Sequence, residues 1–252
     1  MSFSPEELER YARHIVLREI GGPGQAKLKA ARVAVVGAGG LGCPALQYLA
    51  AGGVGQITII DNDVVSLSNL QRQILFATGD VGRPKAEVAA ERLTALNPNV
   101  EAVPQIARLT DETSAMLDDV DLVLDGSDNF TTRYLVNRLC VARSIPLISA
   151  AMTQWEGQIG LFDPARGGPC YECVFPEAPA DGLAPSCAEA GILGALAGVV
   201  GSMMAAAALR HITGAGEDDR GTLLIYDALY PSMRRLKVAK RDDCPVCGQQ
   251  AT

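Results

Sequence analysis

A glycine-rich turn between an apolar run and a helical pattern most constrains how this chain of 252 residues folds. The apolar run covers residues 33–36, and the glycines that follow, Gly37, Gly39, Gly40 and Gly42, contain the pattern G-x-G-x-x-G. Glycines in this place let backbone N–H groups approach a phosphate, and the N-terminus of the following helix adds positive potential. The turn predicts a nucleotide site. The alternative is a tight strand-to-helix turn that binds no ligand, because such a turn needs glycines too.

An aspartate, Asp61, follows the next apolar run, residues 57–60, and lies 24 positions after Gly37. A carboxylate in this place can accept hydrogen bonds from the ribose hydroxyls of a bound nucleotide. Dehydrogenases share this arrangement, so the turn and the acid together predict a nucleotide without identifying it.

Apolar runs and helical patterns alternate through the first 150 residues. The apolar runs are 33–36, 57–60, 100–107, 122–124 and 146–150, and the helical patterns are 41–51, 84–97, 113–117 and 131–142. Strands that alternate with helices predict an α/β fold with a Rossmann-like, doubly wound, mainly parallel sheet covered by helices on both faces.

The pattern changes after Trp155. Strand-like segments at 158–162, 223–226 and 233–239 surround one long apolar segment at 190–209, without the regular alternation. We expect these strands to extend the sheet in an antiparallel arrangement.

Length and charge narrow the class of protein further. With 48% hydrophobic residues, the chain predicts one domain over residues 1–252, with a nucleotide-binding half at about 1–150 and a second half at about 151–252. The net charge of −7 argues against a nucleic-acid partner. Acidic residues stand near the N-terminus where a secretory signal has basic ones, so we expect a cytoplasmic protein.

The segment 190–209 carries no charged residue and is long enough to span a membrane. It is rich in Ala and Gly, and such small side chains suit tight packing in a protein interior. We therefore expect a buried helix and no membrane association. The spacing of Gly194 and Gly198 lets two backbones approach, either in the core or in a dimer interface.

Polar and basic residues follow Asp61, where NAD enzymes need no cations. We expect nucleotide contacts from Asp63, Ser68, Asn69, Gln71, Arg72 and Gln73, together with Leu70 of the same segment, and Arg83, Pro84 and Lys85 lie further on. Pro84 predicts the first helical turn, where a lysine is unfavourable by about 0.3–1 kcal/mol unless an anion lies nearby. Lys85 therefore indicates a polyphosphate, and a solvated lysine at a helix start is the alternative.

Asp128 and Asn129 follow the apolar run 122–124, at the edge of the sheet where open α/β folds bind ligands. A carboxylate there can hold Mg²⁺ on a polyphosphate. Either residue can instead cap the following helix, and one residue can do both.

Four of the seven cysteines form two C-x-x-C pairs, Cys170 with Cys173 and Cys244 with Cys247. Four thiolates in two pairs predict a structural Zn²⁺ site that ties the C-terminal segment to the second half of the chain. Redox dithiols or disulfides are the alternative, which a cytoplasmic location disfavours.

The remaining cysteines are single. Cys187 follows a segment at 176–185 that we expect to be a mobile loop, and it precedes the long apolar helix, where a thiol can be exposed and activated. Cys43 and Cys140 stand among apolar residues in helical patterns, so we expect both to be buried.

Taken together, these motifs resemble the MoeB and ThiF family of E1-like adenylyltransferases, which activate the C-terminal glycine of small ubiquitin-like sulfur carriers. The resemblance implies that Asp61 contacts the ribose of ATP and that Asn69, Arg72, Gln73 and Lys85 surround the triphosphate. It implies further that Asp128 holds Mg²⁺ and that the paired cysteines hold a structural zinc. Cys187 matches a cysteine implicated in sulfur transfer in some members and dispensable in others.

The resemblance also implies partners. Arg13 matches an arginine that reaches into the site of a neighbouring subunit, which implies a homodimer. The carrier ends in Gly-Gly and is of the MoaD type, for molybdenum cofactor biosynthesis, or of the ThiS type, for thiazole synthesis. We expect a separate protein as sulfur donor.

Other classes of protein share part of the pattern. An NAD- or FAD-dependent oxidoreductase shares the first turn but leaves Arg72, Lys85 and the paired cysteines unexplained. A nucleotide-binding scaffold without catalysis shares every motif. RNA-modifying relatives of the same fold are disfavoured by the net charge of −7.

Overall fold

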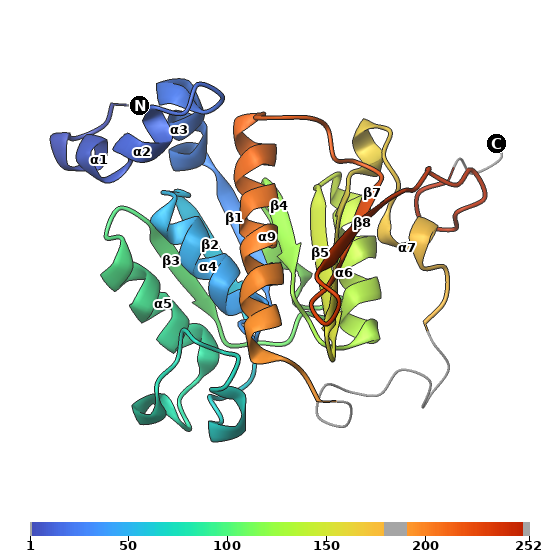
Figure 1. Ribbon diagram of the computed structural model, residues 1–252, viewed down its shortest axis with the longest axis horizontal. Coiled ribbons are helices and arrows are strands. Elements are labelled where there is room, and N and C mark those ends of the chain that lie inside the picture. Colours follow the sequence, from blue (N-terminus) through green and yellow to red (C-terminus); the bar gives the residue numbers. More distant parts are fainter. Residues whose placement is uncertain (1, 179–190, 249–252) are drawn as a thin grey trace.

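A single mixed sheet runs through the computed structural model, which describes residues 2–178 and 191–248 (Figure 1). Within these residues the sheet has eight strands in the order β3-β2-β1-β4-β5-β6-β7-β8. The strands are β1 Arg32–Val36, β2 Gln56–Ile60, β3 Glu101–Gln105, β4 Leu122–Asp125, β5 Leu147–Thr153, β6 Glu156–Phe162, β7 Thr222–Asp227 and β8 Ser232–Lys237. Strands β1 to β5 pair in parallel, and β5, β6, β7 and β8 pair in an antiparallel arrangement. The predicted fold class is confirmed.

Helices cover both faces of this sheet. The α-helices are α1 Pro5–Arg10, α2 Ala12–Ile15, α3 Gly21–Ala30, α4 Gly42–Ala51, α5 Lys85–Leu96, α6 Phe130–Arg143, α7 Tyr171–Val174 and α9 Gly194–Thr213. Short 3₁₀ turns occupy η1 Leu67–Asn69, η2 Thr78–Asp80, η3 Ser114–Leu117 and η4 Pro164–Arg166. Helices α4, α5 and α9 pack on one face and α6 on the other.

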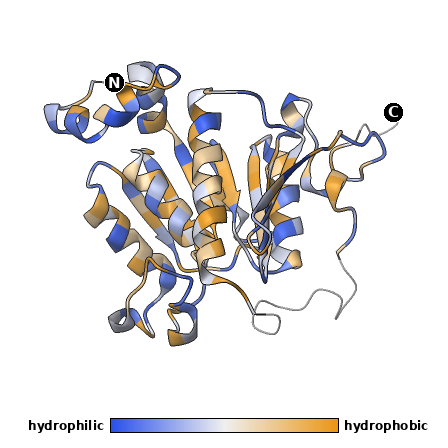
Figure 2. Cartoon of the chain, viewed as in Figure 1, coloured by the Kyte–Doolittle hydropathy of each residue, from blue (hydrophilic) through white to orange (hydrophobic). Residues whose placement is uncertain are grey.

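Alternation along the strands explains the two hydrophobic cores. In β1, Val33 and Val35 face the core that α4, α5 and α9 cover, whereas Ala34 and Val36 face α6. Successive side chains of a strand point to opposite faces, so a strand buried on both sides reads as a continuous apolar run. Figure 2 shows this apolar character concentrated on the central strands.

Among the described residues, one helix, α9, is long and apolar enough to cross a membrane. Its side chains Leu196, Val200, Met204 and Ala208 are buried in the core between the sheet and α4. The segment therefore buries one face in the core, as predicted, whereas its other face, with Val199, is exposed.

Helix α5 begins one residue later than the proline pattern predicts. Pro84 is extended, with φ −57° and ψ 129°, and Lys85 is the first helical residue. Pro84 forms an isolated antiparallel bridge with Val64, and the neighbouring N–H of Val65 donates to the Arg83 carbonyl at 2.9 Å. These strand-like contacts hold Pro84 out of the helix.

The strand order creates a switch point between β1 and β4. From β1 the chain continues through α4 to β2 on one side, and from β4 it continues through α6 to β5 on the other. The two crossovers diverge, which leaves a crevice beyond the carboxyl ends of β1 and β4. The glycine-rich turn and the turn that carries Asp128 both lie at this crevice.

Candidate nucleotide-binding site and cysteine cluster

Two turns meet above the switch point and enclose a cavity of about 820 Å³. Gly37 has φ +91°, and a Cβ built on it would lie 3.2 Å from the Gly126 carbonyl oxygen of the other turn. A Cβ built on Gly42 would collide with the Gly37 carbonyl, so this glycine lets α4 begin directly against the turn. The lack of side chains at these positions lets the two turns and the start of α4 pack closely beside the cavity.

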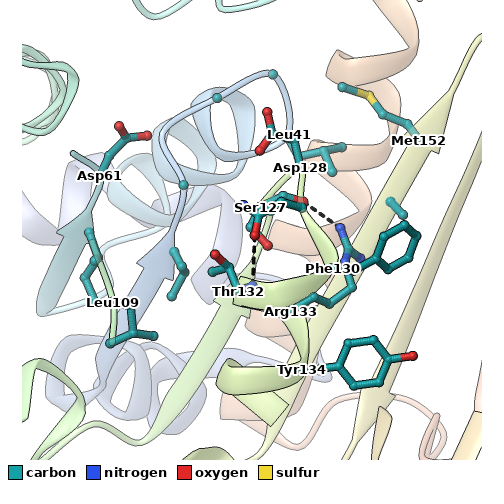
Figure 3. Close-up of a pocket in the computed structure, with 18 of the residues that line it drawn as sticks. Leu41, Asp61, Leu109, Ser127, Asp128, Phe130, Thr132, Arg133, Tyr134 and Met152 are labelled. Atoms are coloured by element: carbon teal, nitrogen blue, oxygen red, sulfur yellow. Dashed lines mark hydrogen bonds between the residues drawn. The ribbon is translucent and has the colours of Figure 1, made fainter. Parts of the chain in front are cut away.

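The cavity is elongated, as Figure 3 shows. Asp61 and Leu109 lie at one end, Phe130 and Tyr134 lie toward the other, and Asp128 lies between them. Of the predicted nucleotide contacts, nine line the cavity wall: Gly37, Gly39, Gly40, Asp61, Asp63, Arg72, Gln73, Asp128 and Asn129. Segments far apart in sequence thus supply one site.

Asp61 is nearly buried at the end of β2, and backbone N–H groups orient its carboxylate. Its Oδ2 accepts from the N–H of Ala38 at 2.7 Å, and its Oδ1 accepts from the N–H of Asp63 at 2.8 Å. Burial raises the pKa of Asp61 above its ordinary value, although the charge of Lys85 and the two N–H donors act in the opposite direction. Each carboxylate oxygen keeps a second lone pair for a ligand hydroxyl.

Asn129, and not Asp128, caps helix α6. The Asn129 side chain accepts from the N–H of Thr132 at 2.9 Å. Asp128 is exposed on the cavity wall, beside Leu41 of the glycine-rich turn (Figure 3). The structure therefore separates the two roles that the sequence left open, and it leaves the Asp128 carboxylate accessible to a ligand.

A buried polar network supports the turn that carries Asp128. Arg133, one turn into α6, donates to the Ser127 carbonyl at 2.6 Å, to Ser149 Oγ at 3.2 Å and to the Ala150 carbonyl at 2.9 Å. Asp125 is fully buried and accepts from Ser127 Oγ at 2.6 Å and from Ser149 Oγ at 2.8 Å. The network joins β4, β5 and α6 directly beneath the cavity (Figure 3).

Sequence reasoning missed Arg133. Its position four residues after the helix-capping Asn129 places it on the same helix face, and that spacing is a signal that was available.

Arg72 and Gln73 reach the cavity from the segment after β2. Arg72 Nη1 donates to the Ser68 carbonyl at 3.3 Å, within one turn of the same segment. Gln73 is 4% exposed, and its Oε1 has no hydrogen-bond partner among residues 2–178 and 191–248. A buried amide oxygen without a partner at a cavity wall indicates a place where a ligand donor can bind.

Lys85 stands behind the cavity wall. Its ammonium group is nearly buried and donates to Asp63 Oδ2 at 3.0 Å, while its backbone N–H donates to the Asp63 carbonyl at 2.9 Å. The sequence predicted a polyphosphate near this lysine, whereas the anion beside it in the structure is the Asp63 carboxylate of the chain itself. Lys85 also lies close enough to Asp61 to act on its pKa.

Residues 68–71, which the sequence also predicted to contact the nucleotide, lie outside the cavity wall as well. Leu70 packs against the hydrophobic core, and Asn69 Nδ2 donates to Ser68 Oγ at 3.5 Å. Gln71 lies against the start of α9, where a Cβ on Gly194 would collide with it.

Aromatic residues form the end of the cavity away from Asp61. The Tyr171 ring contacts those of Tyr134 and Phe175, with ring centroids 5.5 and 4.8 Å away, and Tyr134 Oη donates to the Phe175 carbonyl at 2.9 Å. With Phe130 and the strand residues of β5 and β6 they extend the cavity beyond the two turns. Sequence reasoning did not identify this end, because α7 and α6 meet only in the folded chain.

Arg13 lies near the C-terminal end of α4, whereas the cavity lies at the N-terminal end of that helix. Its neighbour His14 approaches Gln25 Oε1 at 3.2 Å through Nδ1, and Gln25 donates to the Gly52 carbonyl at 2.8 Å. Gly52 follows the last residue of α4, whose first residue is at the cavity, so roughly 15 Å of helix separates the two ends. Arg13 is exposed and is not part of the wall of this chain's cavity.

The four paired cysteines come together beside α7, near the C-terminus. Their sulfur atoms all lie within 4.8 Å of one another, with 3.9 Å between Cys170 and Cys173, 3.6 Å between Cys170 and Cys244, and 3.4 Å between Cys173 and Cys247. Four sulfurs at a Zn–S distance of about 2.3 Å in a tetrahedron are separated by about 3.8 Å. The cluster therefore fits a zinc ion.

Two of the three single cysteines lie among the described residues, and both are buried. Cys43 and Cys140 are buried, as predicted, and burial raises the pKa of Cys43 to about 12 and that of Cys140 further. Both behave as small apolar side chains. Cys187 and most of the predicted loop at 176–185 lie outside the described residues.

Fold and site define a doubly wound α/β protein with a ligand cavity at the switch point and a separate four-cysteine cluster. The sequence model of the ThiF family matches residues 11–246, and the chain belongs to this family. The family expected from the sequence motifs is confirmed.

Similar proteins carry related names. The sulfur carrier protein adenylyltransferase of Thermus thermophilus is 50% identical over 257 residues, which cover 100% of this chain and 95% of that protein. The molybdopterin-synthase adenylyltransferase of Escherichia coli is 44% identical over 247 residues, which cover 98% of each chain. The solved structure of E. coli MccB with ATP superposes with a TM-score of 0.81 at 26% identity and covers 95% of this chain and 73% of that chain.

Proposed function

We propose that this chain is an adenylyltransferase that uses ATP to activate the C-terminal glycine carboxylate of a small ubiquitin-like sulfur-carrier protein. The observation that carries the proposal is the elongated cavity, in which Asp61, Arg72 and Asp128 converge on the glycine-rich turn while an aromatic end remains for a second substrate. Membership of the ThiF family and the printed functions of the relatives support it.

The proposed reaction balances without a general base. A carboxylate oxygen of the carrier's terminal glycine attacks the α-phosphorus of ATP and forms a new P–O bond. The bond from that phosphorus to the bridging oxygen of the β-phosphate breaks, and pyrophosphate leaves with the electron pair. Because the terminal carboxylate is already ionised at neutral pH, no proton has to move. The two histidines of the chain are not needed for this step.

Alignment and charge neutralisation are then the main tasks of the protein. We assign Asp61 to the ribose hydroxyls, the glycine-rich turn and Arg72 to the phosphates, and Gln73 to a donor on the nucleotide. Lys85 acts through its ion pair with Asp63 and its field at Asp61. The exposed carboxylate of Asp128 has the hard oxygen donors that Mg²⁺ prefers, and a bound Mg²⁺ would neutralise charge on the polyphosphate.

The aromatic end of the cavity is the place that we assign to the carrier's tail. An extended Gly-Gly segment has no side chains, so it fits between Phe130, Tyr134 and β6. We assign the body of the carrier to the second half of the chain, within one domain. The carrier is MoaD-like, for molybdenum cofactor biosynthesis, with a ThiS-like carrier as the alternative.

Further parts of the proposal concern assembly. Zinc in the four-cysteine cluster would tie the C-terminal segment to α7. A homodimer would let Arg13 of one protomer reach the site of its partner, since Arg13 is remote from its own cavity. A separate sulfur donor would then act on the adenylated carrier, with Cys187 as a candidate participant, in the cytoplasm.

Intact mass spectrometry of each candidate carrier, after incubation with this protein, ATP and Mg²⁺, tests the proposal. We expect one carrier to gain the mass of AMP less water and the protein to catalyse carrier-dependent ATP–pyrophosphate exchange. Arg72→Ala and Asp128→Ala should abolish the exchange, while Arg138→Ala, an exposed change on α6, should not. Binding of ATP without any adduct would instead indicate a scaffold, and an absorbance change with NADH would indicate an oxidoreductase.

A further inference from the structure

The first residue of α9 lies against the segment that carries Arg72. A Cβ built on Gly194 would lie well under 3.0 Å from both the backbone oxygen and Oε1 of Gln71. The Oε1 atom can rotate away, but the backbone oxygen can move only with the chain. Any side chain at position 194 therefore displaces the peptide that leads directly into Arg72 and Gln73.

The same half of α9 also contacts the glycine-rich turn. A Cβ built on Gly40 would lie 3.3 Å from Ala197 Cβ and 3.5 Å from Arg72 Cγ. One turn further along, a Cβ on Gly201 would collide with the Leu41 carbonyl oxygen. The start of α9 is thus packed on both turns from which the phosphate-binding groups project.

The residues before Gly194 are held at the cavity as well. The N–H of Leu193 donates to the Gln154 carbonyl at 3.0 Å, and Ile192 bridges to the same residue. Gln154 connects β5 to β6, whose residues Thr153 and Glu156 line the cavity. The chain at 192–194 therefore passes between the cavity wall and the Arg72 segment.

We infer that Gly194 is a positioning residue for nucleotide binding: its missing side chain lets the Gln71 carbonyl rest on α9 and thereby places Arg72 and Gln73 in the cavity. The inference rests on the proposed function, because only there are Arg72 and Gln73 assigned to the nucleotide. It adds a residue that makes no contact with the cavity itself.

A matched pair of variants separates this role from general helix packing. Gly198 lies one turn later in α9, and a Cβ there would meet nothing within 4 Å. Alanine favours a helix over glycine at either position. We expect Gly198→Ala to bind MgATP like the wild type, with equal or higher thermal stability.

Calorimetric titration of MgATP into the wild type and both variants is the test. Gly194→Ala should bind roughly tenfold or more weakly, since a displacement of about 1 Å in a binding group has effects of this size. Its melting temperature should fall below that of Gly198→Ala, because the collision with the Gln71 backbone also strains the folded chain, so the titrations are made well below the unfolding range of both variants. Equal affinity of the wild type and Gly194→Ala would overturn the inference, whereas a wild type that binds no MgATP would overturn the proposed function.

Hydrogen exchange of the wild-type protein gives a measurement that does not depend on the variant's folding. On addition of MgATP, amide exchange at 71–73 and at 194–197 should slow together, while the C-terminal turns of α9 should change less. Protection at 71–73 with no change at the start of α9 would contradict the inference.

Discussion

The guanidinium group of Arg133 donates a 2.6 Å hydrogen bond to the carbonyl oxygen of Ser127, so the first turn of α6 holds the turn that carries Asp128. The same guanidinium binds Ser149 and Ala150 of β5, and its Nε lies 3.9 Å from Asp125 Oδ2. The planar guanidinium group presents several N–H donors in fixed directions and so links α6, β5 and the turn after β4. A lysine ammonium group cannot reproduce this geometry.

Arg133→Lys should therefore impair both stability and nucleotide binding. The lysine keeps the charge near Asp125 but leaves buried carbonyl groups without donors, so we expect a loss of about 1–3 kcal/mol in the free energy of unfolding. Urea denaturation and MgATP titration measure the two effects. Arg143→Lys, at the more exposed end of the same helix, should cost less than about 1 kcal/mol, and equal effects in the two variants would contradict the expectation.

The raised pKa of Asp61 predicts a pH dependence of nucleoside binding. The ionised carboxylate accepts ribose hydroxyls, and protonation removes this capacity. Because burial raises the pKa, affinity for adenosine should decline with falling pH before the range is reached in which an ordinary aspartate of pKa about 3.9 titrates. Adenosine is the probe because it has no phosphate that titrates near neutral pH.

Asp61→Asn supplies the control for that measurement. It should bind adenosine weakly at every pH and show no such decline. A wild-type affinity that declines only within or below the range of an ordinary aspartate, with a pKa of about 3.9, would argue against the raised pKa.

Asp80 should stabilise the segment between β2 and α5. It is 4% exposed, its Oδ2 accepts from the N–H of Ala77 at 2.8 Å, and Arg92 donates to the same carboxylate at 2.9 Å. Asp80→Ala should lower the free energy of unfolding by about 1–3 kcal/mol. Glu91→Ala, which removes an exposed partner of Arg83, should cost less than about 1 kcal/mol by the same urea titration.

The pH dependence of this contribution has a defined sign. The Ala77 N–H and Arg92 lower the pKa of Asp80 in the folded protein. The contribution is therefore fully present above the unfolded pKa of about 3.9 and is lost as pH falls through the lower folded value. The stability difference between the wild type and Asp80→Asn should shrink over that acidic range, and a difference that grows there would contradict the assignment.

Metal analysis of protein purified without chelators should find about one zinc ion per chain. Cys244→Ser should lose it and expose the C-terminal segment to proteolysis, because the thiolate pair from that segment holds it against Cys170 and Cys173. Cys140→Ala, which removes a buried thiol outside the cluster, should retain the metal. Zinc-free wild-type protein with an equally protected tail would rule out a structural metal.

Much of the fold could be predicted because each strand and helix carries its own local signal. The run at 33–36 is apolar on both faces, and β1 is buried on both faces between α4 and α6. The glycines at 37 and 42 were recognisable because the turn needs a positive φ at one and a missing Cβ at the other.

Side-chain partners were less accessible from the sequence. The unfavourable position of Lys85 at a helix start predicted a polyphosphate, but the anion beside Lys85 in the structure is Asp63, brought close by the loop after β2. Likewise, Asp128 and Asn129 were equivalent as helix caps until the observed backbone placed Asn129 at the capping position.

The sequence by itself determined the alternating strands and helices, the glycine-rich turn, the acid at the end of β2 and the two cysteine pairs, because periodicity, backbone freedom and ligand type are local properties. Only the tertiary structure decided that Arg133 braces the Asp128 turn and that Gly194 lies against Gln71. Those relationships depend on how strands order themselves across the sheet and on close packing between elements, and neither is encoded in any one segment of the chain.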